Sequence, residues 1–179
     1  MDWVYRKGEL ARGEWDVYLD PSEGKVKGWA HTGMRTATLR DKPLKISADK
    51  NERLIWPLDG TGIEVTFKSD SKSGSHKLRG RKSVFHGTTD LVYLPIDTEI
   101  EITGTGRVII AEAPARNSKP VKFLSKDAFP NVIRGAGPES RQIHDFGGVQ
   151  ALDADRFLVV EVIVPAGNWS GVPPHKHDT

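Results

Sequence analysis

Apolar and polar side chains alternate along several short stretches of this chain, which is the pattern of β-strands with one buried face. Ile63, Val65 and Phe67 place large side chains on one face of an extended segment, and the residues between them are polar. The stretches 107–112 and 157–164 are rich in β-branched residues and are predicted to form strands buried on one or both faces. No stretch has the period of an amphipathic helix of ordinary length.

Turn-forming residues interrupt these stretches at short intervals. Clusters of Gly, Pro, Asp, Ser and Thr occur at 20–24, 59–62, 71–74 and 104–106, in a chain that holds 18 glycines and 11 prolines. Many short strands joined by such turns predict an all-β fold. A jelly roll and an immunoglobulin-like sandwich are both compatible with this pattern.

The chain is predicted to divide at a proline-containing connector. Residues 113–120 hold two prolines and few apolar side chains, so we assign 1–120 to an N-terminal jelly roll that includes this connector. Residues 121–179 are then the first strands of a second β unit. Because a jelly roll uses about eight strands, this second unit is incomplete, unless its strands complete the first domain.

The composition excludes several classes of protein. The absence of cysteine rules out a disulfide scaffold, a thiolate metal site and a cysteine nucleophile. With 26 basic and 24 acidic residues the net charge is only +2, so we expect no nucleic-acid partner, and the basic run 76–82 is interpreted as a solvated hairpin loop. No apolar stretch has the length of a signal peptide or a membrane span, which favours a cytoplasmic protein without a membrane partner.

A candidate metal motif stands near the end of the chain. His175 and His177 are two residues apart, so in an extended strand both imidazoles project to one face and can reach one cation. Imidazole pairs suit divalent Zn, Fe, Ni or Mn, each completed by a carboxylate or a third histidine. A frayed polar tail is the alternative interpretation of the same residues.

Gly167-Asn168-Trp169-Ser170, followed by the stretch 173–178, resembles the signature of the 5-deoxy-glucuronate isomerase family, which is related to the 4-deoxy-5-hexulose-uronate isomerases of pectin breakdown. The stretches 52–60, 80–95 and 134–137 agree with it in order along the chain. This resemblance implies a cytoplasmic bicupin of myo-inositol catabolism, whose C-terminal jelly roll holds a divalent metal (Zn, Mn, Fe or Ni) through two histidines, a glutamate and a further histidine.

By position in that motif, His175 and His177 are the first two ligands, and the other two are expected beyond residue 179. A chain that ends inside its metal motif is expected to be inactive in this form.

The family reaction converts the aldose 5-deoxy-glucuronate into 2-deoxy-5-keto-gluconate through an enediol-like intermediate, and we identify no residue as its proton-transfer base. Arg134, Arg141 and His144 are candidate substrate-binding residues, because an arginine fork pairs well with the carboxylate of a uronate. Alternatively, the two arginines flank a surface turn and His144 starts a strand. Trp169 is interpreted as a core residue rather than a sugar-stacking platform.

Three other functions remain open: a non-catalytic cupin-like ligand-binding module, the related 4-deoxy-5-hexulose-uronate isomerase of pectin breakdown, and a cupin dioxygenase. For each of them, and for the isomerase, the expected partner is a small molecule, which for the isomerase is a sugar acid. A homo-oligomer is also possible, since exposed strand edges of an incomplete second unit favour self-association.

Overall fold

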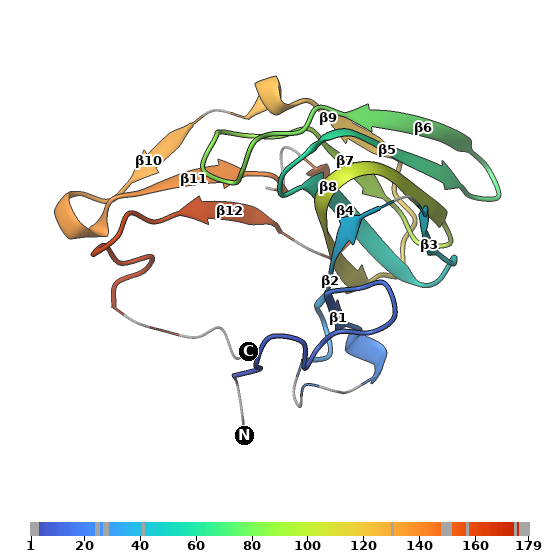
Figure 1. Cartoon of the computed structure of the whole chain (residues 1–179), viewed down its shortest axis with the longest axis horizontal. Helices are drawn as coiled ribbons and strands as arrows, with labels where there is room; N and C mark the ends of the chain where they lie inside the picture. Colours follow the sequence, from blue (N-terminus) through green and yellow to red (C-terminus); the bar gives the residue numbers. More distant parts are fainter. Residues whose placement is uncertain are drawn as a thin grey trace.

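The computed structural model describes residues 4–23, 26, 29–40, 42–129, 131–147, 152–156, 158–173 and 175. Antiparallel β-strands dominate these residues, which confirms the prediction of an all-β protein (Figure 1). No helix in this described part has the length and apolar character needed to cross a bilayer.

The strands form a nine-stranded assembly and a separate three-stranded sheet. The larger assembly has the order β1-β2-β8-β4-β7-β9, with β3 and β5 also paired to β8, and β6 paired to β5. Its strands are β1 (Val17–Leu19), β2 (Gly33–Leu39), β3 (Leu44–Ile46), β4 (Asn51–Pro57), β5 (Thr61–Lys68), β6 (Ser73–Leu78), β7 (Leu91–Leu94), β8 (Glu99–Pro114) and β9 (Lys122–Leu124). The smaller sheet has β10 (Val132–Arg134), β11 (Arg141–Asp145) and β12 (Val160–Ile163), and the 3-10 turns are η1 (Pro21–Glu23), η2 (Lys126–Ala128) and η3 (Gly137–Glu139).

Strand β8 belongs to both halves of the larger assembly. Residues 99–105 pair with β3 and β5, whereas residues 106–114 pair with β2 and β4. The partners change at Gly104 and Gly106, whose φ angles of 126° and 122° are readily adopted only by glycine. The prediction of a turn at 104–106 is therefore wrong, because these glycines bend a continuous strand. A strand shared by two sheets fits the jelly roll better than an immunoglobulin-like sandwich.

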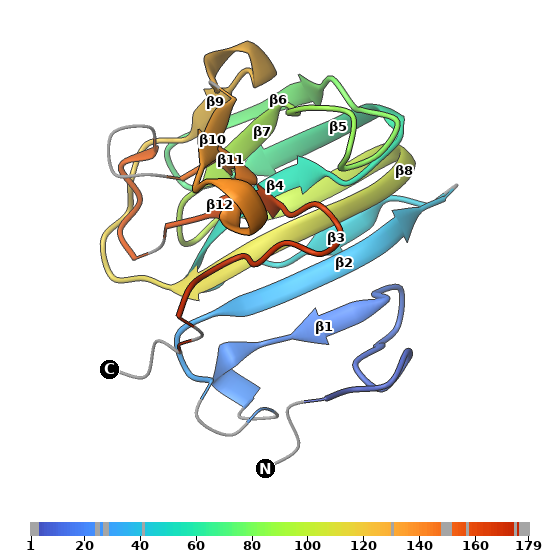
Figure 2. The same ribbon diagram turned by 90° about the vertical axis from the view of Figure 1, so that its left-hand side faces the viewer.

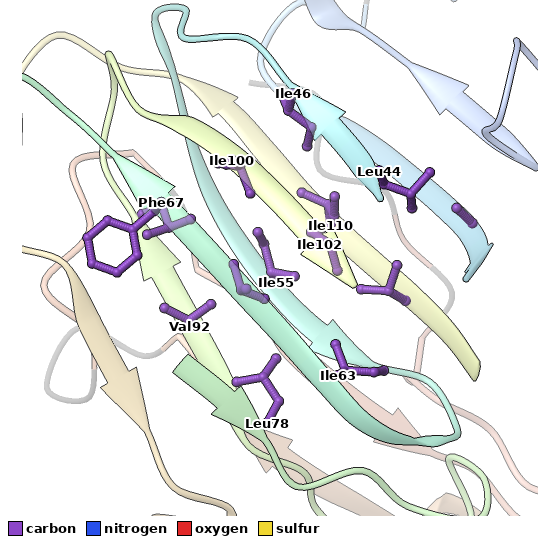
Figure 3. Close-up of a cluster of buried hydrophobic side chains, with 14 of the residues drawn as sticks. Leu44, Ile46, Ile55, Ile63, Phe67, Leu78, Val92, Ile100, Ile102 and Ile110 are labelled. Atoms are coloured by element: carbon purple, nitrogen blue, oxygen red, sulfur yellow. The ribbon is translucent and has the colours of Figure 1, made fainter. Parts of the chain in front are cut away.

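The main core lies between the two halves of this assembly. Ile63 and Val65 have no exposed surface and Phe67 is 2% exposed, as their alternation with polar residues predicted. Large aliphatic side chains from the facing strands fill the space, and a well-filled interior of this kind is the dominant source of stability in a β-sandwich. The cluster includes Leu44, Ile46, Ile55, Leu78, Val92, Ile100, Ile102 and Ile110 (Figure 3).

Strand β4 is buried along its whole length because a second layer covers its outer face. Leu54 and Trp56 pack there with Phe146 and Leu152, and the rings of Trp56 and Phe146 meet edge to face with centroids 5.7 Å apart. Strand β9 extends the larger sheet by pairing with β7. Residues on both sides of position 120 thus pack into one layer, and the division into two jelly rolls at that position stays a prediction.

A group of buried charges crosses the sheet formed by β2, β8 and β4. The Glu112 carboxylate is fully buried and accepts hydrogen bonds from Arg53 Nε at 2.5 Å and from Arg35 Nε at 2.8 Å. Arg53 also donates to Asp49 Oδ2 at 2.5 Å. Burial disfavours the charged guanidinium, but Glu112 and Asp49 outweigh that effect and raise the pKa of Arg53. Each of these buried charges therefore relies on its partners to compensate for the water that it has lost.

The basic run 76–82 is not a solvated hairpin loop, so that prediction is wrong. Its first residues complete strand β6, where Leu78 is 2% exposed. Arg79 forms an ion pair with the buried carboxylate of Asp90 at 2.9 Å, and the Arg81 side chain is itself buried. The error arose because the acidic partners of these arginines lie far away in the sequence.

Asp155 ties the connector to the segment that precedes β12, and this contact is expected to weaken in acid. Hydrogen bonds from the backbone N–H of Arg116 and from Asn117 lower the pKa of Asp155 from the usual 3.8 to about 2. Its contribution to stability is therefore present above about pH 4 and is lost as the pH falls toward 2. In urea unfolding followed across this pH range, Asp155→Asn should lose less stability than the wild type. An equally steep loss in both proteins would contradict this assignment.

Candidate functional site

Two arginines face each other where β10 ends and β11 begins. Arg134 and Arg141 are cross-strand partners, so both side chains lie on the same face of the small sheet. Arg134 is exposed and Arg141 is partly exposed, and Arg141 Nη1 donates to the carbonyl of Glu139 at 3.1 Å. Like charges directly opposite on a sheet are unfavourable unless an anion screens them. The pair is therefore a suitable site for a carboxylate, which arginine binds with paired N–H groups.

The turn between these arginines requires glycine. Gly135 has a φ angle of 80°, and a Cβ atom at this position would lie 2.1 Å from the carbonyl oxygen of Glu139. The short turn η3 follows, and the hairpin closes with Arg134 and Arg141 in register. This hairpin lies at the far left of Figure 1, at the end of the small sheet. The spacing of the arginines is thus set by backbone geometry.

The segment after β12 docks on the same hairpin. Asn168 Nδ2 donates to the carbonyl of Ser140 at 2.8 Å, and the backbone N–H of Trp169 donates to the carbonyl of Pro138 at 2.8 Å. The side chain of Trp169 is not buried, since the residue is 56% exposed. The interpretation of Trp169 as a core residue is therefore wrong. The docked segment leads directly toward His175.

His175 has a contact that suits a metal ligand. Its Nδ1 lies 2.9 Å from the carbonyl oxygen of Pro173, which can only accept, so Nδ1 is the donor in this contact. Metal-binding histidines commonly donate one ring N–H to a backbone carbonyl in this way, which orients the ring. His177, the other predicted ligand, lies outside the described residues. Within the part of the chain that the structure describes, no group of three or more His, Asp or Glu is arranged to hold an ion.

His144 lies on the opposite face of the small sheet from the two arginines. Side chains alternate along β11, so residues 141 and 144 point to opposite sides. The His144 residue is 1% exposed; its Nδ1 donates to Glu161 Oε1 at 2.9 Å, and its Nε2 accepts from Gln142 Nε2 at 2.8 Å. The structure brings Arg134 and Arg141 together but does not bring His144 to them.

Arg81 completes a buried ionic cluster that sequence reasoning missed. Its Nη1 and Nη2 donate to the two carboxylate oxygens of Glu161 at 2.7 and 2.6 Å, and Glu161 also accepts from His144. The three side chains come from the loop after β6, from β12 and from β11. Glu161 could have indicated this cluster from the sequence. It is a charged residue inside a β-branched stretch, and such residues are rarely buried without a partner.

Comparisons with known proteins relate this chain to a family. A family model described as the KduI/IolB family matches residues 3–179. A 5-deoxy-glucuronate isomerase of Halalkalibacterium halodurans is 36% identical over 121 residues, which cover 66% of this chain and 42% of that protein. One of Bacillus velezensis is 37% identical over 170 residues, which cover 91% of this chain and 58% of that protein.

A solved structure resembles the fold described above. The crystal structure of an IolB-like protein from Salmonella typhimurium LT2 superposes with a TM-score of 0.79 at 27% sequence identity, covering 94% of this chain and 63% of that chain. Against the two curated relatives, this chain spans 42% and 58% of their lengths.

Proposed function

Because the chain belongs to the KduI/IolB family, we propose that the whole protein is a metal-dependent aldose-ketose isomerase that converts 5-deoxy-glucuronate into 2-deoxy-5-keto-gluconate. The curated relatives named above carry the name 5-deoxy-glucuronate isomerase, and the fold is similar to that of an IolB-like protein. The proposal concerns the whole protein, since this chain spans about half the length of those relatives. Its cytoplasmic location and its possible assembly as a homo-oligomer stay predictions.

The observation that carries the proposal is the pair formed by Arg134 and Arg141. A uronate substrate has a carboxylate at one end, and these cross-strand arginines offer it a fixed, positively charged binding surface. The segment held by Asn168 and Trp169 runs from this hairpin toward His175. On this proposal, the substrate carboxylate binds at the arginine pair. The predicted role of His144 in substrate binding has no such geometric support.

The residue types present fit a divalent first-row metal. His175, oriented by the carbonyl of Pro173, would supply one imidazole ligand through Nε2, and His177 stays the predicted second ligand. Ligands of this kind do not distinguish Zn, Mn, Fe and Ni. When bound, the ion supplies Lewis-acid polarisation of the substrate carbonyl and stabilises the oxyanion of an enediol-like species.

The reaction can be tested by NMR of 5-deoxy-glucuronate mixed with the whole protein and Zn²⁺ or Mn²⁺. We expect the aldehyde and hydrate signals to be replaced by those of a ketose. Arg134→Met and Arg141→Met should each raise KM about tenfold with little change in kcat, because each removes a charge-assisted hydrogen bond to the carboxylate in both ground and transition states. Arg107→Met removes a partly exposed arginine of β8 that pairs with Asp59, and serves as the matched control.

Three results would count against this proposal. An unchanged substrate spectrum in the presence of bound metal would reject the isomerase reaction. Equal KM values for the Arg141→Met and Arg107→Met proteins would reject the carboxylate site. Oxygen uptake with the same substrate would instead support a dioxygenase.

A further inference from the structure

Arg81 projects from a rigid part of the larger assembly. The preceding residue, Gly80, packs so closely on Gly60 that an added Cβ would lie 1.7 Å from the Gly60 carbonyl oxygen, and the Gly60 N–H donates to the Arg81 carbonyl at 3.0 Å. On the same loop, Asp90 accepts from the Arg79 N–H at 2.7 Å and from the Lys126 N–H at 2.8 Å. The backbone that carries Arg81 is thus held in place by contacts that do not involve the small sheet.

The side chain of Arg81 binds to the small sheet. It is 2% exposed and makes a two-pronged contact with the Glu161 carboxylate, while Nη1 also donates to the Gly87 carbonyl at 2.8 Å. Its Nε is buried and has no hydrogen-bond partner among the residues that the structure describes. Leaving a buried donor unpaired is unfavourable. The position of the guanidinium is therefore determined by Glu161 rather than by the best solvation of the arginine itself.

From Glu161 a continuous set of contacts leads to His175. Glu161 and His144 are cross-strand partners as well as hydrogen-bond partners, so Arg81 acts on both β12 and β11. Strand β11 begins at the hairpin whose turn holds the Asn168 side chain and the Trp169 N–H. The docked segment then continues to His175. Figure 2 shows the small sheet in front of the larger assembly.

We propose that Arg81 is a positioning residue for the histidine motif: by holding Glu161 and His144, it fixes β12 on β11 and thereby fixes residues 158–173, which lead to His175. This inference rests on the proposed function only where it concerns the metal. It gives the larger assembly a role in the active site, although none of its strands supplies a predicted ligand. The role is indirect, because Arg81 acts through Glu161.

The test compares Arg81→Met with Arg79→Met. Arg79 lies two positions before Arg81 and carries the same charge, but it pairs with Asp90 and Asp127 instead of Glu161. Hydrogen exchange measured by mass spectrometry should be about tenfold faster over 158–173 in Arg81→Met, and unchanged over β4. Calorimetric titration with Ni²⁺ alone should give an affinity about tenfold weaker. Arg79→Met should match the wild type in both measurements. Arg81→Lys, which keeps the charge but not the two-pronged geometry, should lie between them, and it replaces Arg81→Met if that variant does not fold.

The outcomes separate this inference from the proposed function. Faster exchange over 158–173 with unchanged Ni²⁺ affinity, or equal effects of the two arginine variants, would overturn the positioning role. If the wild-type protein binds no Ni²⁺, the metal part of the proposed function fails. The exchange rates over 158–173 would then decide by themselves whether Arg81 holds the segment.

Discussion

Replacing Glu112 with alanine is expected to lower the free energy of unfolding by about 3 to 5 kcal/mol, the largest stability loss predicted for a single substitution in this chain. The Glu112 side chain has no exposed surface, and it is the shared acceptor for Arg53 and Arg35, whose side chains are 0% and 8% exposed. Without it, two guanidinium groups lose the carboxylate that compensates their burial. Glu112→Gln keeps the shape but removes the charge, and should lose part of this amount.

Urea unfolding provides the measurement, and Glu101→Ala provides the matched control. Glu101 lies on the same strand, but it pairs with Lys45 at the surface, where the two side chains are 42% and 74% exposed. An exposed pair of this kind contributes at most about 1 kcal/mol. Similar losses for the two alanine variants would show that the buried charges are not coupled in the way the geometry indicates.

Replacing His175 with alanine is expected to weaken the binding of Ni²⁺ or Zn²⁺ about 100-fold or more, with a matching loss of isomerase activity in the whole protein. In the proposed site, the imidazole that donates from Nδ1 to the Pro173 carbonyl would bind the ion through Nε2, and alanine supplies no such ligand. His86→Ala is the control, since that imidazole contacts Ser83 in an exposed turn. Calorimetric titration of the three proteins gives the affinities. Equal affinity of the His175→Ala and wild-type proteins would remove His175 from the proposed metal site.

The parts of the fold that could be predicted are those in which one strand face is buried and the other is solvated. Alternation identified the strand that holds Ile63, Val65 and Phe67, because the polar residues between them mark the outer face. Strand β4 has no such signal, since Phe146 and other residues more than fifty positions further along the chain cover its outer face. Local periodicity does not report a second covering layer.

The incorrect predictions share a cause, which is that the deciding partner is remote in sequence. The glycines at 104 and 106 were interpreted as a turn because Gly and Thr are turn-forming residues, whereas pairing with β2 and β4 continues the strand. Arg81 was assigned to a solvent-exposed loop, because the Glu161 carboxylate with which it pairs is 80 residues away. Trp169 was interpreted as a core residue, yet the hairpin holds it at the surface.

For the candidate site, the sequence suggested candidate residues but not the face of the sheet on which each one lies. Arg134 and Arg141 were identified because arginines suit a uronate, and the structure adds that they are cross-strand partners. His144 was grouped with them by proximity in sequence, but a separation of three residues on one strand puts it on the other face. His175 and His177 were identified by their two-residue spacing and by the family resemblance, and only His175 lies within the described residues.

The double membership of β8 also governs when the larger assembly can form during synthesis. Strands β2, β3, β4 and β5 all hydrogen-bond to residues between 99 and 114, which the ribosome releases after all four of those strands. Until Pro114 has left the exit tunnel, β2, β3, β4 and β5 lack the strand that joins them, although β1 can already pair with β2 and β5 with β6. Nascent chains arrested before that point should therefore be clients of holding chaperones, and those arrested well beyond it should be released.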